Sequence, residues 1–353
     1  MQSTTFEALK IRLQQSPKKW LVTGAAGFIG SHLLECLLKL DQVVVGLDNF
    51  STGHARNIED VRLRVGAKQW KNFSFVPGDV GVFTDCRRAC IGVQVILHQA
   101  ALGSVPRSLE NPLQSHANNV NGCLNVFEAA RGAGVERLVF ASSSSVYGDN
   151  PLLPKIEENI GQPLSPYAAT KLMGEIYASV YHRCYKLPII GLRYFNVFGA
   201  RQDPDGTYAA VIPRWIAAIS RGEPAVINGD GETSRDFCYI ANVLQANLLA
   251  SGVDPNDALG RVFNVAVGHR VTLNELFVKI RDRVARTYPS AAGAQPRHVP
   301  ERAGDVRHSL ADIGAIERHL GYHPTHSMDQ GLDETCAWYL NTARAPGFRA
   351  GVE

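Results

Sequence analysis

The chain has 353 residues, of which 45% are hydrophobic and 20% charged, with a net charge of +3. This composition is typical of a soluble globular protein with one large or two closely associated domains. Charges of both signs are mixed without a dense Lys/Arg stripe, no apolar run approaches membrane-spanning length, and seven cysteines occur without a CxxC spacing. We therefore expect no nucleic-acid or membrane partner and a cytoplasmic protein with reduced thiols.

Strand-like and helix-like segments alternate through the first half of the chain. After the lead-in "FEALKIRL", which could form a short amphipathic helix, "KWLVTGAAGFIGSHLLECLLKL" predicts a strand, a glycine-rich turn and a helix. Three more strands are predicted at "QVVVGLDNF", "FSFVPGDV" and "VQVILHQAAL", and a helix at "NNVNGCLNVFEAARGAG". A fifth strand at "RLVFASSSSVYG", a long helix at "SPYAATKLMGEIYASVYHRCY" and a sixth strand at "PIIGLRYFNVFG" follow. This alternation predicts an α/β fold, a Rossmann-like doubly wound parallel sheet with helices on both faces.

The pattern loosens after about residue 195, where turn-rich segments separate isolated helices such as "TLNELFVKIRDRVA" and "HSMDQGLDETCAWYL". We expect a nucleotide-binding domain over residues 1–195, with residues 1–19 as an N-terminal extension, and a smaller mixed α/β substrate domain over residues 196–345. The boundary is open, because a strand such as "RVFNVA" could return to the first domain.

A dinucleotide site is predicted between the first strand and the first helix. Gly24, Gly27 and Gly30 repeat every third residue there, where the backbone must turn tightly and approach a pyrophosphate at the helix N-terminus. Asp48 ends the second strand and is suited to the adenosine ribose hydroxyls, which favours NAD over NADP; the alternative is a plain turn residue. Asp79 is interpreted either as a plain turn residue or as a contact to the adenine. The other residues expected at the cofactor are Phe28, Ile29, Asn49, Val80, Gln99, Tyr167 and Lys171.

Tyr167 and Lys171 form a Y-x3-K pair on the long helix, and their i, i+4 spacing places them on one face. A nearby ammonium and the positive nicotinamide ring of NAD+ both favour a phenolate. Such a tyrosine can remove a hydroxyl proton while hydride leaves the same carbon. The pair carries weight only because a serine-rich strand end and a dinucleotide motif precede it.

Together these features resemble the extended short-chain dehydrogenase/reductase family over nearly the whole chain. The resemblance, aligned from "VYG", makes Ser143 the hydroxyl that completes a catalytic triad with Tyr167 and Lys171. Ser142 and Ser144 would mainly satisfy strand-end hydrogen bonds, and Ser145 would contact the sugar.

Nucleotide-sugar enzymes of the family match further, in "LRYFNVFG", "AAVIPRW", "GETSRDFCYI" and "ERAGDVRHS". The resemblance implies that Asn196, Arg235 and Arg302 lie at the diphosphate, Asp305 at the ribose, and Ser309 beside C2 of the sugar. A small residue at that last position leaves room for an acetamido group; the alternative is that Ser309 only caps the turn after it. The other substrate-binding residues implied are Gly103, Ser104, Ser143, Ser145, Gln202, Ala210 and Val211.

The reaction implied is 4-epimerisation. Dehydratases of this family carry an Asp-Glu pair after the triad hydroxyl and decarboxylases a glutamate before "VYG", whereas this chain has Ser144 and Ser145. The chain most resembles the UDP-galactose 4-epimerase group, in the branch acting on UDP-N-acetylhexosamines. Tyr167 would take the 4-OH proton, hydride would pass from C4 to a retained NAD, and both would return after the 4-keto sugar turns over. The alternatives are a UDP-N-acetylhexuronic acid 4-epimerase, a nucleotide-sugar dehydratase or decarboxylase, and a non-enzymatic NAD sensor.

Two further expectations concern a metal and a partner. His319, His323 and His326 resemble metal ligands, but Pro324 interrupts their helix and no acidic partner is expected nearby, so we expect no metal. His98 is expected to pack beside the cofactor without a catalytic role. Relatives dimerise through the two helices containing "NNVNGCLNVF" and "YAATKLMGEIY", and we expect a homodimer here.

Overall fold

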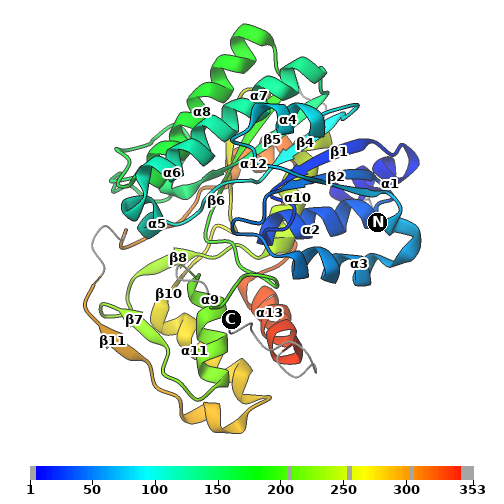
Figure 1. Cartoon of the computed structure of the whole chain (residues 1–353). Helices are drawn as coiled ribbons and strands as arrows, with labels where there is room; N and C mark the ends of the chain where they lie inside the picture. The colour runs from blue at the N-terminus through cyan, green and yellow to red at the C-terminus, as the bar shows by residue number, and fades with distance from the viewer. Residues whose placement is uncertain (1–4, 206–208, 253–256, 302–305, 343–353) are drawn as a thin grey trace.

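The computed structural model describes residues 5–205, 209–252, 257–301 and 306–342, and its larger part is built on one sheet (Figure 1). Every neighbouring pair of strands in this sheet is parallel. The spatial order is β3 (Phe73–Pro77), β2 (Val43–Asp48), β1 (Lys19–Thr23), β4 (Val95–His98), β5 (Arg137–Ser143), β6 (Ile189–Tyr194) and β9 (Val262–Val265). The Rossmann-like prediction is confirmed, and the strand within "RVFNVA" does return to the sheet as β9.

The order of the strands reverses between β1 and β4. The chain moves outward from β1 to β2 and β3, then returns to β4 and moves outward in the opposite direction. Connections leaving the carboxyl ends of β1 and β4 therefore diverge, and in open parallel sheets a ligand binds in the crevice that this leaves. The glycine-rich turn lies at this position.

Helices cover both faces of the sheet (Figure 1). On one face lie α2 (Phe28–Lys39), α3 (Ala55–Trp70), α10 (Ile240–Gly252) and α12 (Gly314–Leu320), with α1 (Thr5–Gln15) packed outside α10. On the other lie α4 (Phe83–Ala89), α7 (Gly122–Ala133) and α8 (Pro166–Tyr185). The short helices α5 (Val105–Glu110) and α6 (Pro112–His116), the π-helical turn η1 (Ala117–Asn121) and the 3₁₀ turn η2 (Ser144–Tyr147) complete this part. Each face has its own buried apolar cluster, as a sheet covered on both sides requires.

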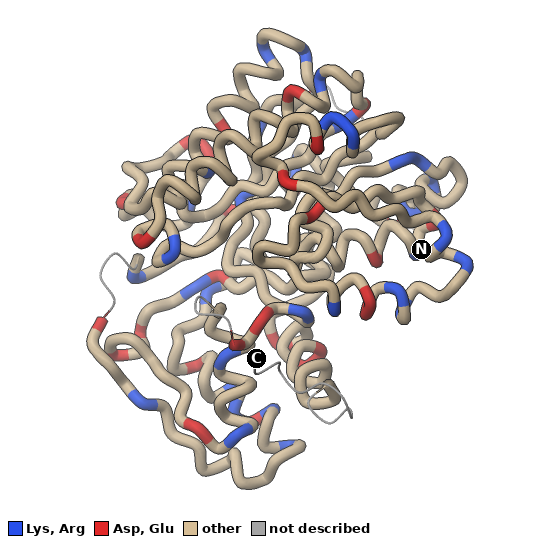
Figure 2. Tube along the Cα trace, viewed as in Figure 1, with Lys and Arg blue, Asp and Glu red and all other residues tan. Residues whose placement is uncertain are grey.

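The smaller part combines three helices with two two-stranded sheets. The helices are α9 (Val211–Ser220), α11 (Leu273–Ala285) and α13 (Met328–Thr342), with the 3₁₀ turn η3 (Pro289–Gly293); the sheets pair β7 (Val226–Asn228) with β11 (Arg297–Val299) and β8 (Ser234–Asp236) with β10 (Arg270–Thr272). The two helices predicted here are confirmed as α11 and α13. Lys, Arg, Asp and Glu are interspersed over both parts of the described chain (Figure 2), and no described helix is long and apolar enough to cross a bilayer.

The connection that follows β6 is fixed at several points. The Arg201 guanidinium is 2% exposed and forms ion pairs with Glu35 on α2 and with Asp60 on α3. Next to it, the Tyr339 hydroxyl on α13 donates to the Gln202 carbonyl. The segment is thus tied to two helices of the larger part and one of the smaller part, which restricts movement between them.

Strand β9 forms one edge of the sheet. Its Asn264 N–H points away from β6 and donates to the Glu157 carboxylate at 2.8 Å. Burial raises the pKa of Glu157, although this hydrogen bond and Arg193 oppose the effect. A side chain thus occupies a main-chain group that an edge strand would otherwise leave open.

Candidate active site

The glycine-rich turn has the geometry that its spacing predicts. Gly24 adopts φ +69°, and a Cβ on it would lie 2.9 Å from the Ala100 nitrogen of the neighbouring β4 loop. A Cβ on Gly30 would lie 1.9 Å from the Gly24 carbonyl oxygen. Gly27 is the N-cap of α2 and has no side chain to satisfy the first N–H groups of that helix. Gly24 and Gly30 therefore permit close packing, and Gly27 leaves the helix N-terminus available to an anion.

Asp48 stabilises this turn directly. One carboxylate oxygen accepts from the Ala26 N–H at 2.9 Å, and the other accepts from the Phe50 N–H at 2.8 Å. The side chain is buried, yet each oxygen keeps lone-pair capacity beyond its single bond. The turn interpretation of Asp48 is confirmed. The ribose interpretation stays a prediction, and the same carboxylate also lines the pocket described next.

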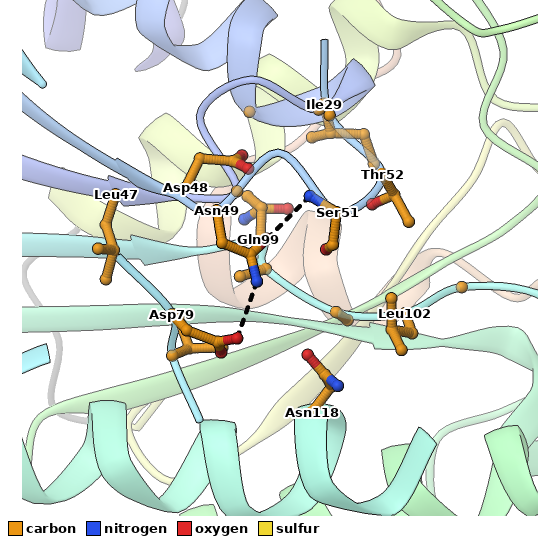
Figure 3. Close-up of a pocket in the computed structure, with 18 of the residues that line it drawn as sticks. Ile29, Leu47, Asp48, Asn49, Ser51, Thr52, Asp79, Gln99, Leu102 and Asn118 are labelled. Atoms are coloured by element: carbon orange, nitrogen blue, oxygen red, sulfur yellow. Dashed lines mark hydrogen bonds between the residues drawn. The ribbon is translucent and has the colours of Figure 1, made fainter. Parts of the chain in front are cut away.

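A pocket of about 350 Å³ opens between the turn and the ends of β2, β3 and β4 (Figure 3). At one wall the Asn49 amide donates to the Asp79 carboxylate at 2.8 Å. The predicted cofactor residues that line the pocket are Gly24, Gly27, Phe28, Ile29, Gly30, Asp48, Asn49, Asp79, Val80 and Gln99, together with the predicted substrate residue Gly103. Lining residues that sequence reasoning missed are Leu47, Ser51, Thr52, Gly53, Gly78, Ala100, Ala101, Leu102 and Asn118. The polar run "NFSTG" after the second strand was a usable signal for three of these.

Gln99 contributes to the pocket wall with its amide already bonded. The Tyr194 hydroxyl donates to its oxygen at 3.0 Å, and its nitrogen donates to Asn247 at 3.2 Å. These two hydrogen bonds fix the orientation of the Gln99 side chain.

Helix α8 positions the Tyr167–Lys171 pair. The Ser165 hydroxyl accepts from the Ala168 N–H at 3.1 Å, as an N-cap should, and Pro166 is the first helical residue. Lys171 Nζ donates to the Ala141 carbonyl of β5 at 3.0 Å and lies 5.8 Å from the centre of the Tyr167 ring. Among the described residues none forms a hydrogen bond with the Tyr167 hydroxyl, which leaves that group available to a ligand.

The four serines at the end of β5 have distinct environments. Ser142 is buried and donates to Glu175 on α8. The Ser143 hydroxyl accepts from the Ser145 N–H at 3.1 Å. Ser143 follows Ala141, whose carbonyl accepts from Lys171, by two residues. The Ser145 hydroxyl oxygen is buried without a hydrogen-bond partner among the described residues. The expectation that Ser142 serves the strand end is therefore too narrow, because its partner is a carboxylate on the helix that carries Tyr167.

His98 is buried at the end of β4, with its Nδ1 2.7 Å from the Thr23 hydroxyl. Burial, assisted by the nearby Lys171 ammonium, lowers the pKa of His98 to about 3. The imidazole is therefore neutral near pH 7, which agrees with a packing role.

The predicted substrate residues in the loops after β4 and β6 lie on separate segments. Ser104 adopts φ +96° and caps α5 by accepting from the Arg107 N–H. Asn196 has φ +34° and donates to the Asp236 carbonyl at 3.0 Å. Gln202 donates to the Val197 carbonyl, and its oxygen is buried without a partner among the described residues. Ala210 and Val211 are the N-cap and the first residue of α9.

Strand β8 brings Arg235 and Ser309 near each other. The Ser309 N–H donates to the Ser234 carbonyl at 3.0 Å, and the Arg235 guanidinium donates to the Arg307 carbonyl at 3.2 Å. Within the described chain the Ser309 hydroxyl has no hydrogen bond, so the structure gives the capping alternative no support there. Arg302 and Asp305 lie outside the described residues.

The expectation that no acidic partner lies near the three C-terminal histidines is wrong. Each has its own carboxylate: His319 pairs with Asp257 at 2.8 Å, His323 with Glu317 at 3.7 Å and His326 with Glu334 at 3.2 Å. The three histidines do not converge, and within the described ranges no group of three possible metal ligands occurs.

Comparison with known proteins identifies the family. A model of the NAD dependent epimerase/dehydratase family matches residues 20–266. The UDP-glucose 4-epimerase of Mycolicibacterium smegmatis is 36% identical over 331 residues, 92% of this chain and 99% of that protein. This chain belongs to the NAD-dependent epimerase/dehydratase family. Its fold is that of the UDP-N-acetylglucosamine 4-epimerase of Methanobrevibacter ruminantium, which was solved with UDP-N-acetylmuramic acid. The two chains are 38% identical and superpose with a TM-score of 0.83 over 92% of this chain and 99% of that one. The UDP-glucuronic acid 4-epimerase of Bacillus cereus, solved with its UDP-sugar and NAD, gives 31% identity and a TM-score of 0.81 at the same coverage.

The cofactor of this epimerase is NAD, and the pocket fits it. The close packing at Gly24 leaves no space for a Cβ beside the β4 loop, and the uncapped N-terminus of α2 faces the pocket. Asp48 adds a carboxylate at the end of β2, where a 2′-phosphate would be repelled.

Proposed function

We propose that this epimerase interconverts UDP-N-acetylglucosamine and UDP-N-acetylgalactosamine through a 4-keto intermediate. The observation that carries the choice of sugar is Ser309, a small, half-buried residue held against β8 next to Arg235. A packed site cannot cheaply yield the volume of an acetamido group, so a small residue must already be present. The relative from Methanobrevibacter ruminantium, named for UDP-N-acetylglucosamine, supports the same choice.

The residues that follow Ser143 support epimerisation over elimination or decarboxylation. Ser144 and Ser145 form the 3₁₀ turn η2 where a dehydratase requires acidic side chains. Serine hydroxyls do not act as general acids at neutral pH, whereas epimerisation needs one base and a reversible hydride acceptor.

In the proposed mechanism, bound NAD supplies the reversible hydride acceptor. Tyr167 removes the proton of the 4-hydroxyl and later returns it, with Ser143 hydrogen-bonded to the same sugar oxygen. Lys171, held by the Ala141 carbonyl, places its positive charge beside the Tyr167 ring. The sugar turns about its bond to the diphosphate between the two transfers, with the diphosphate held by Arg235 and Asn196.

We also propose that two copies associate in the cytoplasm. Helix α8 carries exposed apolar side chains, Met173, Ile176 and Tyr177, on the surface that faces away from the sheet. This is one of the two helices through which dimerisation was expected.

The test of the sugar assignment is Ser309→Tyr. We expect the variant to lose most activity on the two UDP-N-acetylhexosamines and to keep activity on UDP-glucose and UDP-galactose, because the ring fills only the acetamido space. The measurement is kcat/KM for these four substrates and for UDP-glucuronic acid, without added cofactor, with products resolved by NMR.

The matched control is Ser309→Ala, which keeps the space and should leave all five values close to those of the wild type. An equal loss on every substrate in folded Ser309→Tyr would remove Ser309 as the determinant. A wild-type preference for UDP-glucuronic acid would reassign the substrate while leaving the epimerase chemistry in place.

A further inference from the structure

A buried ion pair lies directly behind the proposed catalytic residues. Glu175 on α8 and Arg193 on β6 have side chains only 7% and 3% exposed. The Arg193 Nε donates to one carboxylate oxygen at 2.9 Å and its Nη2 donates to the other at 2.7 Å. Ser142 on β5 donates to the first of these oxygens as well.

The pair is in register with the proposed triad. Ser142 lies opposite Arg193 in the β5–β6 ladder, one residue before Ser143. Glu175 follows Lys171 by one helical turn on α8, as Lys171 follows Tyr167. Two side-chain hydrogen bonds between described residues thus join α8 to the end of β5, from Lys171 to the Ala141 carbonyl and from Ser142 to Glu175.

Arg193 also connects to the turn beyond the serines. Its Nη1 donates to the Glu157 carbonyl at 2.9 Å, and its guanidinium lies 4.9 Å from the centre of the Tyr147 ring. Tyr147 in turn donates to Asn264 on β9 at 2.7 Å. The Arg193 guanidinium therefore contacts α8 through Glu175 and the turn η2 through Tyr147, and Glu175 extends this contact to Ser142 at the end of β5.

Stability alone does not explain an ion pair at this place. Removing two charges from water is expensive, and apolar side chains of similar volume often stabilise a core as well or better. A bidentate guanidinium–carboxylate contact also fixes the orientation of the two side chains relative to each other, which apolar contacts do not do.

We propose that Glu175 and Arg193 are positioning residues, which set the placement of Tyr167 relative to Ser143 and thereby determine turnover. The proposal rests on the proposed triad but not on which sugar is the substrate. A misplacement of about 1 Å in reacting groups can cost about 10²-fold in rate. The pair acts through Ser142, the α8 backbone and the β5 end, and it contacts no substrate atom itself.

The decisive variant replaces the whole polar contact by apolar side chains, as Ser142→Ala/Glu175→Met/Arg193→Met in the full-length enzyme with its retained NAD. We expect Tm close to that of the wild type, because both members of the buried pair are replaced together and the half-buried Glu157 keeps its hydrogen bond from the Asn264 N–H. We expect kcat to fall about 10²-fold, with KM for the best UDP-sugar and the bound NAD per subunit nearly unchanged. Arg193→Lys keeps the charge and loses the bidentate contact with Glu175, so kcat should fall in this variant as well, but by less than in the triple variant.

The matched control is Tyr181→Phe, which removes a hydrogen bond between α8 and Glu128 of α7 away from the triad. It should keep the wild-type kcat. Unchanged kcat in the folded triple variant would overturn the proposal, and so would a fall in kcat of equal size in the control. A folded wild-type enzyme that converts none of the five UDP-sugars would refute the proposed function instead, since the test of Glu175 and Arg193 uses the substrate on which the wild type is active.

Discussion

At the scale of single residues, Tyr167 is the group whose chemistry is easiest to isolate. Tyr167→Phe keeps the ring and removes the hydroxyl, which has no hydrogen bond within the described part of the protein. General acid–base groups typically contribute about 10²–10⁴-fold, so we expect turnover to fall by that factor while the UDP-sugar still binds. Turnover and UDP-sugar affinity, measured together, check this, and retention of about half the turnover would exclude Tyr167 as the base.

His98 connects a single buried residue to the pH dependence of stability. Its pKa is lowered from 6.5 to about 3 in the folded protein, mainly by burial. As the pH falls through this interval, the unfolded chain binds a proton that the folded chain does not, so the free energy of unfolding decreases. At pH values above this interval the residue has no such effect.

Between about pH 3 and pH 6.5 we therefore expect the free energy of unfolding of His98→Asn to fall less steeply with decreasing pH than that of the wild type. The difference in slope is at most about 1.4 kcal/mol per pH unit. Urea unfolding of NAD-loaded protein from about pH 8 to pH 5 measures this slope. The exposed His116→Asn should keep the wild-type slope, and an equally steep slope in His98→Asn would contradict the assignment.

Residue roles could be predicted where a spacing reports a backbone requirement. The three glycines could be predicted, because their spacing is set by the turn itself. Glu175 was not predicted, although its i, i+4 spacing from Lys171 places it on the same face of the helix. Arg193 lies in the segment "LRYFNVFG" that resembles the family, but its ion pair depends on how α8 packs over β6, which no local pattern contains.

At the scale of elements, the turn between β1 and α2 depends on Asp48 at the end of β2. Asp48→Ala removes both main-chain hydrogen bonds and the charge. We expect weaker NAD retention and less discrimination against NADP, because the turn loosens and the repulsion of a 2′-phosphate disappears. The NAD content of purified protein and the affinities for NAD and NADP measure the two effects.

Asp48→Asn separates these effects, because an amide can keep one acceptor but carries no charge. It should keep more NAD than Asp48→Ala and discriminate equally poorly. Wild-type protein that carried NADP would refute the ribose role altogether.

Among elements, the strands of the sheet could be predicted because buried parallel strands read as short apolar runs. Helix α3 was missed, since Gly66 within it adopts φ +82° and interrupts the helical pattern. The segment predicted as one helix at "NNVNGCLNVF" begins with a π-helical turn, which hydrophobic periodicity does not reveal. In the smaller part the strands have only three residues each, too few to show alternation.

At the scale of the whole molecule, the proposed domain boundary at residue 195 does not separate two independent structural units, because β9 from the second segment completes the sheet of the first. A fragment of residues 1–195 lacks β9 and α10, which pack against β6 and carry buried side chains such as Leu248 and Leu249. We expect this fragment to show no cooperative unfolding transition, because an apolar face of its sheet is uncovered. Thermal unfolding followed by circular dichroism, beside the full-length chain, tests this; a sharp transition in the fragment would show an independent domain.

The two edges of the sheet also decide how copies of this protein can meet. At β9 the Glu157 carboxylate already occupies an outward N–H, and β3 ends at Pro77, which has no N–H to donate. Each edge thus lacks one main-chain donor that a strand of a second copy would use to extend the sheet, and the proposed contact between copies is instead made by side chains on helices such as α8. A contact between helices leaves the sheet unextended, and the way these two strands end therefore disfavours growth of the protein into fibrils.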